Sequence, residues 1–343
     1  MDIMDKNTIT IKEVAEYANV SQATVSRVIN QQSTVKEKNL IKVLNAIKEL
    51  GYTPNSTAKA LATKKSNSIG MLVGSLDGPF FGPLMHATEN EIYKLGLHLI
   101  VTSGQDSLDK ETESLKFLQS KQVDGAIVHS DKISDEGLVN YVKAFKNFVI
   151  LNRYLPDLEP HCLYVDNELG GYLATKHLLE NGHKRIACIT GPLVKHEARD
   201  RLLGYMKALA ESNIEYDPSL IIEGRFDHKD NLAKANQLVN NINDVTAVFC
   251  QNDNIALAVY DACSQHNLLV GDDLSIVSFD NDLMSKHLRP LLTTVGFSIH
   301  EMGMIAGQML VDQLSNKDNL KGKKLTPSLE VRESVKKITE NTK

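Results

Sequence analysis

The sequence predicts an all-α helix-turn-helix head followed by an α/β core of doubly wound parallel sheets. Near the N-terminus, two short runs of apolar residues at helical spacing are separated by an interruption at Asn19. From Ser68 onward, short apolar runs alternate with amphipathic helices, and the alternation begins again after residue 160. Because these repeated units are too many for one sheet, we expect a 343-residue chain with a small head and a two-lobed core.

The first predicted helix begins beside Thr10, which has the spacing of a capping box with Glu13. Asn19 adopts a left-handed conformation at low cost, so the chain can turn there, and Ser21 is expected to cap a second helix. The inward-facing positions of the two helices are Ile11, Val14, Ala15, Ala18, Val25, Val28 and Ile29. This is the layout of a helix-turn-helix, whose second helix enters the major groove of DNA.

Polar side chains cover the other face of the second predicted helix. Gln22 and Arg27 carry groups that hydrogen-bond to base edges, and arginine pairs most naturally with guanine. The positions suited to phosphate contacts are Ser21, Thr24, Ser26 and Asn30. Spacing alone leaves open a helical hairpin without a nucleic-acid partner, and this polar face favours DNA binding.

A third helix is expected from a second capping box, Thr34 to Glu37, to a stop at Gly51. Its apolar residues are expected to close a small core over the first two helices: Leu40, Ile41, Leu44, Ile47 and Leu50. After Pro54, the segment STAKALA spans only about two helical turns, which is too short for a stable isolated helix.

The predicted strands of the core are apolar runs bounded by helices and turns. They are Ile69–Val73, Leu97–Thr102, Gly125–His129, Phe148–Leu151, Cys162–Val165, Ile186–Thr190, Leu220–Glu223, Ala247–Cys250 and Ile276–Phe279. Helices are expected from near Phe81, Asp109 and Asp135, and over Glu168–Asn181 and Arg199–Ser212. Two such lobes facing each other form a cleft, with a ligand expected at the carboxyl ends of the strands.

Charge is divided unevenly along the chain. Residues 1–65 carry ten Lys or Arg against six Asp or Glu, a net charge of +4, whereas the remainder has 28 against 37, a net charge of −9. A basic head on an acidic body suits a protein that presents one end to phosphate.

The composition argues against several other classes of protein. The scattered cysteines, Cys162, Cys188, Cys250 and Cys263, are expected to be buried thiols rather than disulfides or zinc ligands. No stretch is apolar enough to span a membrane, and the charged N-terminus does not match a signal peptide, so we expect a cytoplasmic location. The sequence has no G-x-S-x-G, H-E-x-x-H or P-loop motif, so we expect no enzyme, cofactor or metal site.

Two segments near the N-terminus resemble the DNA-binding head of the LacI/GalR family of bacterial repressors: IKEVAEYANVSQATVSRVIN and KELGYTPNSTAKALA. The resemblance implies a head over residues 1–51, a hinge helix and linker over 52–67, and a disordered tail over 339–343. It also implies a periplasmic-binding-protein-like core over 68–338, with one lobe of about 68–165 and 296–324 and another of about 166–295 and 325–338. The chain would cross between the lobes near Asp166, Val295 and Leu325.

The resemblance also assigns roles in DNA binding. Gln22 and Ala23 stand at the pair that reads the operator in the family. The hinge helix, which starts at Asn55, is expected to order on DNA, and Leu61 matches the leucine that family members wedge between base pairs in the minor groove. Packing within the linker remains the alternative for Leu61.

Family motifs place a ligand-gripping arginine at Arg201 in EARDRLLGY, with Asn252, Asp280 and the aromatic Phe226 as further ligand residues. Arg, Asn and Asp at strand ends suit vicinal hydroxyls of a sugar. Strand-end positions and aromatic faces add five more candidates: Asp77, Phe80, Phe81, His129 and Asn152. Core packing for the two phenylalanines and a structural role for His129 stay open, and Asp253 is expected to cap the helix that follows it.

The resemblance implies a homodimeric transcriptional repressor that binds double-stranded operator DNA and is released by a small sugar. The segments DGPFFGPL, ILNRYLP and RPLLTTV are most similar to the galactose repressor and isorepressor group, so galactose or a related sugar is expected. No heptad-rich tetramerisation tail follows Val331, which favours a dimer. An activator or a corepressor-dependent regulator stays open, and a sugar-modifying enzyme or a sugar-binding transport protein is disfavoured.

Overall fold

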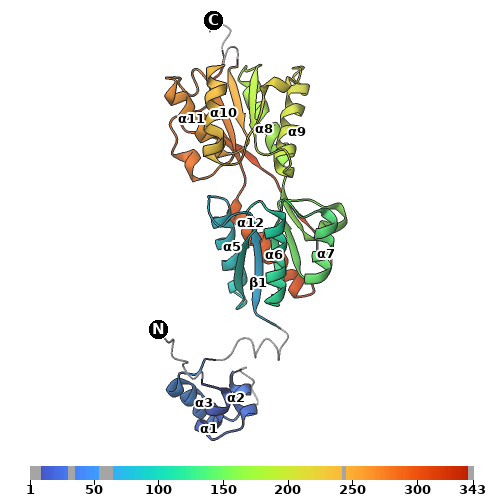
Figure 1. The fold of residues 1–343 in the computed structure, drawn as a ribbon, viewed down its shortest axis with the longest axis vertical. Helices are drawn as coiled ribbons and strands as arrows, with labels where there is room; N and C mark the ends of the chain where they lie inside the picture. The colour runs from blue at the N-terminus through green and yellow to red at the C-terminus, as the bar shows by residue number, and fades with distance from the viewer. Residues whose placement is uncertain (1–8, 30–34, 54–64, 242–244, 339–343) are drawn as a thin grey trace. The chain divides into compact units, whose positions relative to one another are not determined.

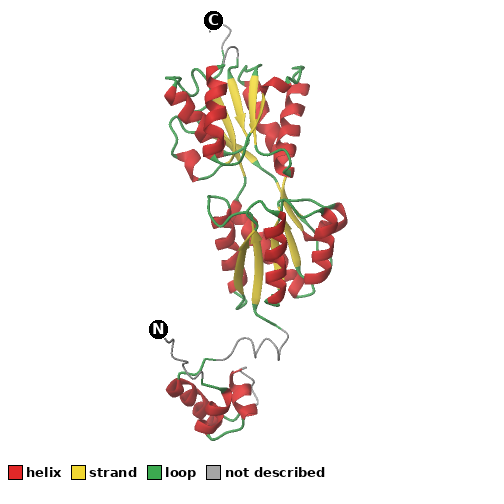
Figure 2. Cartoon of the chain, viewed as in Figure 1, coloured by secondary structure: helices red, strands yellow, loops and turns green. Residues whose placement is uncertain are grey.

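The chain divides into two compact units, Met1–Ser66 and Asn67–Lys343, here called the head and the core (Figure 1). The computed structural model describes residues 9–29, 35–53, 65–241 and 245–338. The head is helical, whereas the core consists of strands flanked by helices (Figure 2). The predicted fold class, a helix-turn-helix head with a two-lobed α/β core, is confirmed.

The head contains α1 (Ile11–Ala18), α2 (Gln22–Ile29) and α3 (Glu37–Leu50). The predicted capping box begins α1: the amide of Thr10 donates to Glu13 Oε2 over 2.7 Å, and the amide of Glu13 donates to the Thr10 hydroxyl. Asn19 has a φ of 50°, which allows the turn, and the amide of Thr24 donates to Ser21 Oγ over 3.2 Å. The predicted helix-turn-helix is therefore present with its caps.

The prediction for α3 was wrong in two respects. Its N-cap is Lys36, without a side-chain hydrogen bond, and Glu37 is the first helical residue; Thr34 lies outside the described residues. Leu40, Ile41 and Leu44 are exposed, whereas Ile47 and Leu50 pack against the head core as predicted, beside the buried Val43 and Ala46. The buried residues of that core are Val14, Ala15, Ala18, Val25, Val28, Val43 and Ala46.

The described part of the core contains two six-stranded sheets. The first sheet has the strand order β11-β5-β4-β3-β1-β2, and the second has the order β12-β10-β9-β8-β6-β7. Pairing is parallel except between β10 and β12. The strands are β1 (Ser68–Val73), β2 (His98–Ser103), β3 (Gly125–His129), β4 (Phe148–Leu151), β5 (Cys162–Val165), β6 (Ile186–Thr190), β7 (Ile221–Glu223), β8 (Ala247–Cys250), β9 (Ser275–Asp280), β10 (Thr293–Gly296), β11 (Lys323–Leu325) and β12 (Ser328–Glu330).

Helices cover both faces of each sheet, which explains why the central strands are continuous apolar runs. In β1, Met71 packs with residues of α5 and α12, whereas Leu72 packs with residues of α6 and α7. In the second lobe, α8 and α9 cover one face and α10 and α11 cover the other (Figure 1). The helices are α5 (Phe81–Tyr93), α6 (Leu108–Ser120), α7 (Asp135–Phe145), α8 (Asn167–Glu180), α9 (His196–Glu211), α10 (His228–Asn240), α11 (Asp253–Gln265) and α12 (Ile299–Leu314).

The chain passes between the two lobes three times. It leaves the first sheet after β5, returns from β10 to α12, and passes again from β11 to β12. Because the lobes share these three connections, the loops at the carboxyl ends of their strands lie on opposite sides of one cleft.

All four cysteines are buried free thiols, which confirms the prediction from their spacing. Burial raises the pKa of Cys188 and of Cys250 above the ordinary thiol value, so both stay protonated at neutral pH. No helix in the described ranges is long and apolar enough to cross a membrane.

Candidate ligand cleft and DNA-facing helix

A cleft of about 440 Å³ lies between the two lobes. Its volume is within the range of small-molecule sites in proteins. The nine residues predicted as ligand contacts all line this cleft: Asp77, Phe80, Phe81, His129, Asn152, Arg201, Phe226, Asn252 and Asp280. The structure thus brings together side chains that are up to about 200 positions apart in the sequence, because each lies at the carboxyl end of a strand or in the loop or helix that follows it.

Arg201 is the most firmly held side chain of the cleft and is 5% exposed. Its Nε donates to Asn167 Oδ1 over 2.9 Å, one terminal nitrogen donates to the carbonyl of Gln251, and the other lies 3.6 Å from Asp280 Oδ1. The ring of Phe279 stacks beneath the guanidinium at 3.6 Å. Burial lowers the pKa of Arg201, and Asp280 partly offsets this. The guanidinium is therefore fixed in position at the cleft.

Two glycines set the position of α9, which carries Arg201. A Cβ on Gly171 of α8 would lie 2.0 Å from the Arg201 carbonyl oxygen, and one on Gly204 of α9 would lie 2.0 Å from the Glu168 carbonyl oxygen. The two helices approach too closely for any side chain at these positions. This contact fixes the backbone from which the guanidinium projects.

Asp280 ends β9 with a φ of 105°, a backbone conformation that non-glycine residues rarely adopt. Burial raises the pKa of Asp280 to about 6, because the favourable charge of Arg201 only partly offsets the desolvation and Asp282 opposes it. The carboxyl is therefore close to its titration point near neutral pH, and it can accept hydrogen bonds from ligand hydroxyls once ionised.

Asn252, rather than Asp253, caps α11, so the prediction that Asp253 caps this helix was wrong. The amide of Ile255 donates to Asn252 Oδ1 over 2.9 Å, while Asn252 Nδ2 donates to the Phe226 carbonyl over 3.1 Å. Asp253 is instead fully buried and accepts hydrogen bonds from Ser278 Oγ and Thr294 Oγ1. Burial raises the pKa of Asp253 well above its ordinary value, and the nearby Asp280 adds to this effect.

Aromatic rings form an apolar part of the lining. Phe80 and Phe81 meet edge to face with ring centroids 5.0 Å apart, and Phe81 packs against the His129 ring at 5.2 Å. His129 is 7% exposed, and its Nδ1 has no hydrogen-bond partner among the described residues. Phe226 lies against Gly191, where a Cβ would come within 2.3 Å of the ring.

Asp77 and Asn152 complete the predicted set. The Ser75 hydroxyl donates to Asp77 Oδ1, and the Asp77 amide donates back to Ser75 Oγ over 3.2 Å. Asn152 follows β4 with a φ of 56°, and its amide donates to the Leu163 carbonyl over 2.7 Å. Both residues therefore sit in tight turns that present their side chains at the edge of the first sheet.

Eight polar residues of the lining that the structure describes were not predicted as ligand contacts: Ser75, Asp106, Asp131, Lys195, Glu197, Arg225, Asp227 and Asn254. Most lie in loops after β2, β3, β6 or β7, so the rule that placed His129 and Asn152 at strand ends could have found them.

Lys195 links the two sides of the cleft. Its ammonium lies 2.9 Å from Asp106 Oδ1 and 2.8 Å from Asp131 Oδ2, both on the first lobe. Burial alone would lower the pKa of Lys195, but the carboxylates of Asp131 and Asp106 raise it above its ordinary value. For Asp131, burial is outweighed by His129 and Lys195, which lower its pKa. Both members of the pair are therefore charged at neutral pH.

Glu197 is 7% exposed beside this pair. Burial raises the pKa of Glu197, and repulsion from the Asp131 carboxylate raises it further. His129 and Lys195 lower this pKa, but only in part. A carboxyl of this kind, facing a ligand cleft, can donate or accept a hydrogen bond.

In the head, α2 presents the predicted DNA-reading face. Ser21, Gln22, Ala23 and Arg27 are exposed, whereas Thr24 and Ser26 are half-buried. The Ser21 and Thr24 hydroxyls lie 2.9 Å apart. The remaining predicted DNA contacts, Asn30, Asn55 and Leu61, lie outside the described residues.

Two family models match the chain. Residues 10–55 match the model of bacterial regulatory proteins of the lacI family, and residues 175–335 match a periplasmic binding protein-like domain.

Full-length relatives and solved structures agree with these models. The chain is 36% identical to the HTH-type transcriptional repressor PurR of Aliivibrio salmonicida, over 96% of this chain and 99% of the relative. It is 35% identical to the HTH-type transcriptional regulator GalR of Salmonella typhimurium strain LT2, over 88% of each chain. These two values are nearly equal, so similarity alone does not assign galactose.

Among solved structures, the lac repressor dimer bound to operator and the anti-inducer ONPF matches with a TM-score of 0.87 and 30% identity. The match covers 96% of this chain and 100% of that one. These relatives are transcriptional regulators rather than enzymes, as the sequence predicted. The chain belongs to the LacI family of bacterial regulatory proteins.

Proposed function

We propose that the chain is a sequence-specific transcriptional repressor whose affinity for operator DNA is controlled by a small sugar bound in the cleft. The observation that carries the proposal is the pair of the buried Arg201 and the partly exposed Asp280, which lies in a cleft of the same chain that bears an exposed helix-turn-helix face. The two functions meet in one polypeptide, which is the requirement for a ligand-controlled regulator.

The cleft chemistry supports a polyhydroxyl ligand. Arg201 offers donors in a fixed fork, Asp280 offers acceptors, and Asn252 retains one free lone pair and one free proton beyond its two hydrogen bonds. Phe80 and Phe81 supply apolar faces on which a pyranose ring can stack. The ligand contacts are proposed to be Asp77, Phe80, Phe81, His129, Asn152, Arg201, Phe226, Asn252 and Asp280, and galactose or a related sugar is the first ligand to test.

On the DNA side, we propose a homodimer on a pseudopalindromic operator, by analogy with the operator-bound lac repressor dimer. Gln22, Ala23 and Arg27 read base edges, and Ser21, Thr24, Ser26 and Asn30 hold phosphates. Asn55 and Leu61 contact the minor groove from the hinge. Such a regulator acts where the bacterial chromosome lies, in the cytoplasm.

A second candidate ligand is a purine base acting as a corepressor. It is favoured by the similarity to PurR and by the aromatic part of the cleft, since a flat heterocycle also stacks on phenylalanine. The two candidates predict opposite effects on operator affinity, because a corepressor strengthens DNA binding and an inducer weakens it.

The test has two stages. The purified full-length chain is used to select operators from random-sequence DNA, and its melting temperature is then screened against neutral monosaccharides, disaccharides and purine bases. We expect a sugar to raise the melting temperature and to weaken binding to the selected operator. A purine base that strengthens operator binding, with no response to any sugar, would favour the second candidate.

A further inference from the structure

Each described cation of the cleft lining, Lys195, Arg201 or Arg225, lies within 4 Å of at least one carboxylate oxygen. Lys195 contacts Asp106 and Asp131, and Arg201 lies 3.6 Å from Asp280. Arg225 lies within 3.8 Å of Asp106 and 3.0 Å of Asp230. An anionic ligand would therefore meet positive groups whose charge is already neutralised.

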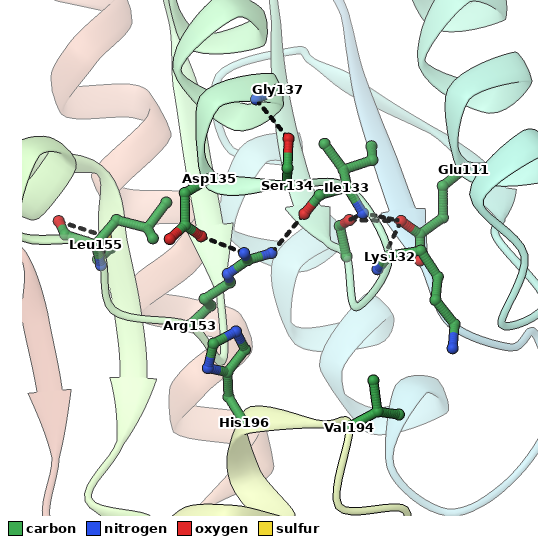
Figure 3. A network of polar contacts seen from close by, with 12 residues as sticks. Glu111, Lys132, Ile133, Ser134, Asp135, Gly137, Arg153, Leu155, Val194 and His196 are labelled. Carbon is green, nitrogen blue, oxygen red and sulfur yellow. Dashed lines mark hydrogen bonds and ion pairs between the residues drawn. The ribbon is translucent and has the colours of Figure 1, made fainter.

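The first lobe holds Asp131 in place to receive Lys195. Asp131 belongs to a loop pinned by the buried Glu111, whose carboxylate accepts from the Ser130 hydroxyl and from the amides of Asp131, Lys132 and Ile133 (Figure 3). These contacts are 2.5 Å for the hydroxyl and 3.2 Å for each amide.

Arg153 fastens the far end of the same loop. Its guanidinium donates to the Ile133 carbonyl over 2.8 Å and also binds Asp135, as Figure 3 shows. Because both ends of the loop are tied within the first lobe, Asp131 does not need to reorganise to accept the ammonium of the second lobe. The pair is a preorganised feature of the cleft rather than a mobile surface contact.

The cleft lining carries more carboxyl groups than cations, so its net charge is negative. Among the described residues, it contains six carboxyl groups, Asp77, Asp106, Asp131, Glu197, Asp227 and Asp280, against the three cations Lys195, Arg201 and Arg225. The balance stays negative even when the buried Glu197 is protonated. A phosphate group placed among these carboxylates would be desolvated and repelled, whereas neutral hydroxyls would find acceptors.

We propose that the effector is an uncharged polyol and that Asp131 and Asp106 exclude phosphorylated sugars by neutralising Lys195. Lys195 then serves to tie the two lobes together instead of binding an anion. This inference rests on the proposed function, since it names the class of sugar that the cleft accepts.

The experiment compares matched probes by calorimetric titration into the full-length chain at constant ionic strength. The probes are galactose, glucose, their 6-phosphates and inorganic phosphate. The variants are Asp131→Asn and the milder Asp106→Asn, whose side chain is 45% exposed. Asp272→Asn is the control, because it removes one negative charge at an exposed residue that pairs with Lys336, outside the cleft lining. Melting curves establish that each variant folds, and Asp106→Asn alone carries the test if Asp131→Asn does not fold.

For the unaltered chain, we expect a neutral sugar to bind at least about tenfold more tightly than its 6-phosphate. Asp131→Asn and Asp106→Asn should lower the ratio of the dissociation constant of the 6-phosphate to that of its parent sugar several-fold. Asp272→Asn should leave this ratio unchanged. A 6-phosphate that binds the unaltered chain as tightly as its parent sugar would overturn the inference and leave the proposed sugar effector standing. An equally large decrease of this ratio in Asp272→Asn would also overturn the inference. The net charge of the chain, rather than the pairing of Lys195, would then explain the weak binding of the phosphate ester. If no neutral sugar binds, either in these titrations or in the melting-temperature screen of monosaccharides and disaccharides, the proposed sugar effector is refuted, and this inference with it.

Discussion

The guanidinium of Arg201 lies 3.6 Å from the carboxylate of Asp280, with the ring of Phe279 stacked beneath it at 3.6 Å. This contact joins the end of β9 to α9 in the lining of the cleft. A buried arginine keeps its charge only where partners compensate for the lost water, and here Asn167, Gln251 and Asp280 do so.

Asp280→Asn should abolish the response to sugar while leaving operator binding intact. The amide keeps the shape of the side chain but loses the charge that faces Arg201, and the head is a separate compact unit. Arg201→Ala should have the same functional effect but also destabilise the core by up to about 3 kcal/mol, because it leaves the carboxyl of Asp280, which is only 20% exposed, without its partner. Operator titrations with and without sugar, together with melting curves, measure both effects. Loss of operator binding in a fully folded Asp280→Asn chain would contradict this separation.

Sugar affinity should rise between pH 5 and pH 7. Burial raises the pKa of Asp280 to about 6 from the ordinary 3.8, with Arg201, Asp253 and Asp282 as the charged groups that face it. The carboxyl is therefore mostly protonated at pH 5 and mostly ionised at pH 7, and only the ionised form accepts hydrogen bonds at both oxygens. Linkage then gives an increase in affinity of about tenfold over this interval.

The raised pKa of Asp280 also makes the free energy of unfolding depend on pH. Since the folded chain holds the proton of Asp280 more tightly than the unfolded chain, the contribution of Asp280 to stability is greatest below about pH 4 and is lost as the pH rises to about 6.

Calorimetric titration of sugar into the chain at several pH values measures the sugar affinity. A constant or falling affinity from pH 5 to pH 7 would show that an ionised Asp280 is not the acceptor.

Asn252→Ala should lower the stability of the core by about 1 kcal/mol, because it removes the N-cap of α11. Asn252→Asp is the matched variant: it keeps an oxygen for the amide of Ile255 but cannot donate to the Phe226 carbonyl. We expect Asn252→Asp to recover most of the lost stability. If both variants unfold at the same denaturant concentration, the cap contributes little and the Phe226 contact is the one that matters.

Arg27→Ala should remove operator discrimination while retaining weak, salt-sensitive binding to any DNA. A bidentate arginine–guanine contact contributes about 1–3 kcal/mol of discrimination, whereas non-specific affinity comes from phosphate neutralisation. Arg27→Lys tests this role further, because lysine keeps the charge but lacks the planar fork. Binding to selected operator and to random DNA is compared over a range of salt concentrations. Discrimination by Arg27→Lys equal to that of the unaltered chain would assign Arg27 to phosphate.

Local sequence patterns predicted much of the fold. Gly125–His129, Phe148–Leu151 and Ala247–Cys250 were predicted with the boundaries that the strands have, since continuous apolar runs mark buried parallel strands. Strand ends then identified His129 and Asn152 as cleft residues. Arg201, Asn252 and Asp280 came from family motifs, which carry information that spacing alone does not.

The predictions for the buried face of α3 and for the N-cap of α11 were wrong where two neighbouring sets of residues fit the local pattern equally well. In α3, the stripe of Leu40, Ile41 and Leu44 and the stripe of Val43 and Ala46 both have helical spacing, and only packing against α1 and α2 buries the second. Similarly, Asn252 and Asp253 are both favourable N-cap residues. Asp253 is drawn into the core by Ser278 and Thr294, which are 25 and 41 positions away.

The unpredicted part of the cleft depends on contacts between the lobes. Lys195 meets Asp106 and Asp131 only because three chain crossings hold the carboxyl ends of the two sheets on opposite sides of one cleft. Nothing in the sequence near Lys195 indicates these partners, although its position after β6 places it at a strand end. Local patterns therefore predict which side chains enter the cleft better than they predict how those side chains pair.

Control of the head by the cleft is tested most directly by one pair of titrations. Sugar is titrated into the full-length chain with and without saturating selected operator, and the two dissociation constants are compared. A hundredfold loss of operator affinity on sugar binding corresponds to about 2.7 kcal/mol of coupling, and reciprocity requires operator to weaken sugar binding by the same factor. We therefore expect the sugar to bind markedly more weakly in the presence of operator. Equal affinities would contradict the claim that the cleft controls the head, and tighter binding with operator would make the sugar a corepressor.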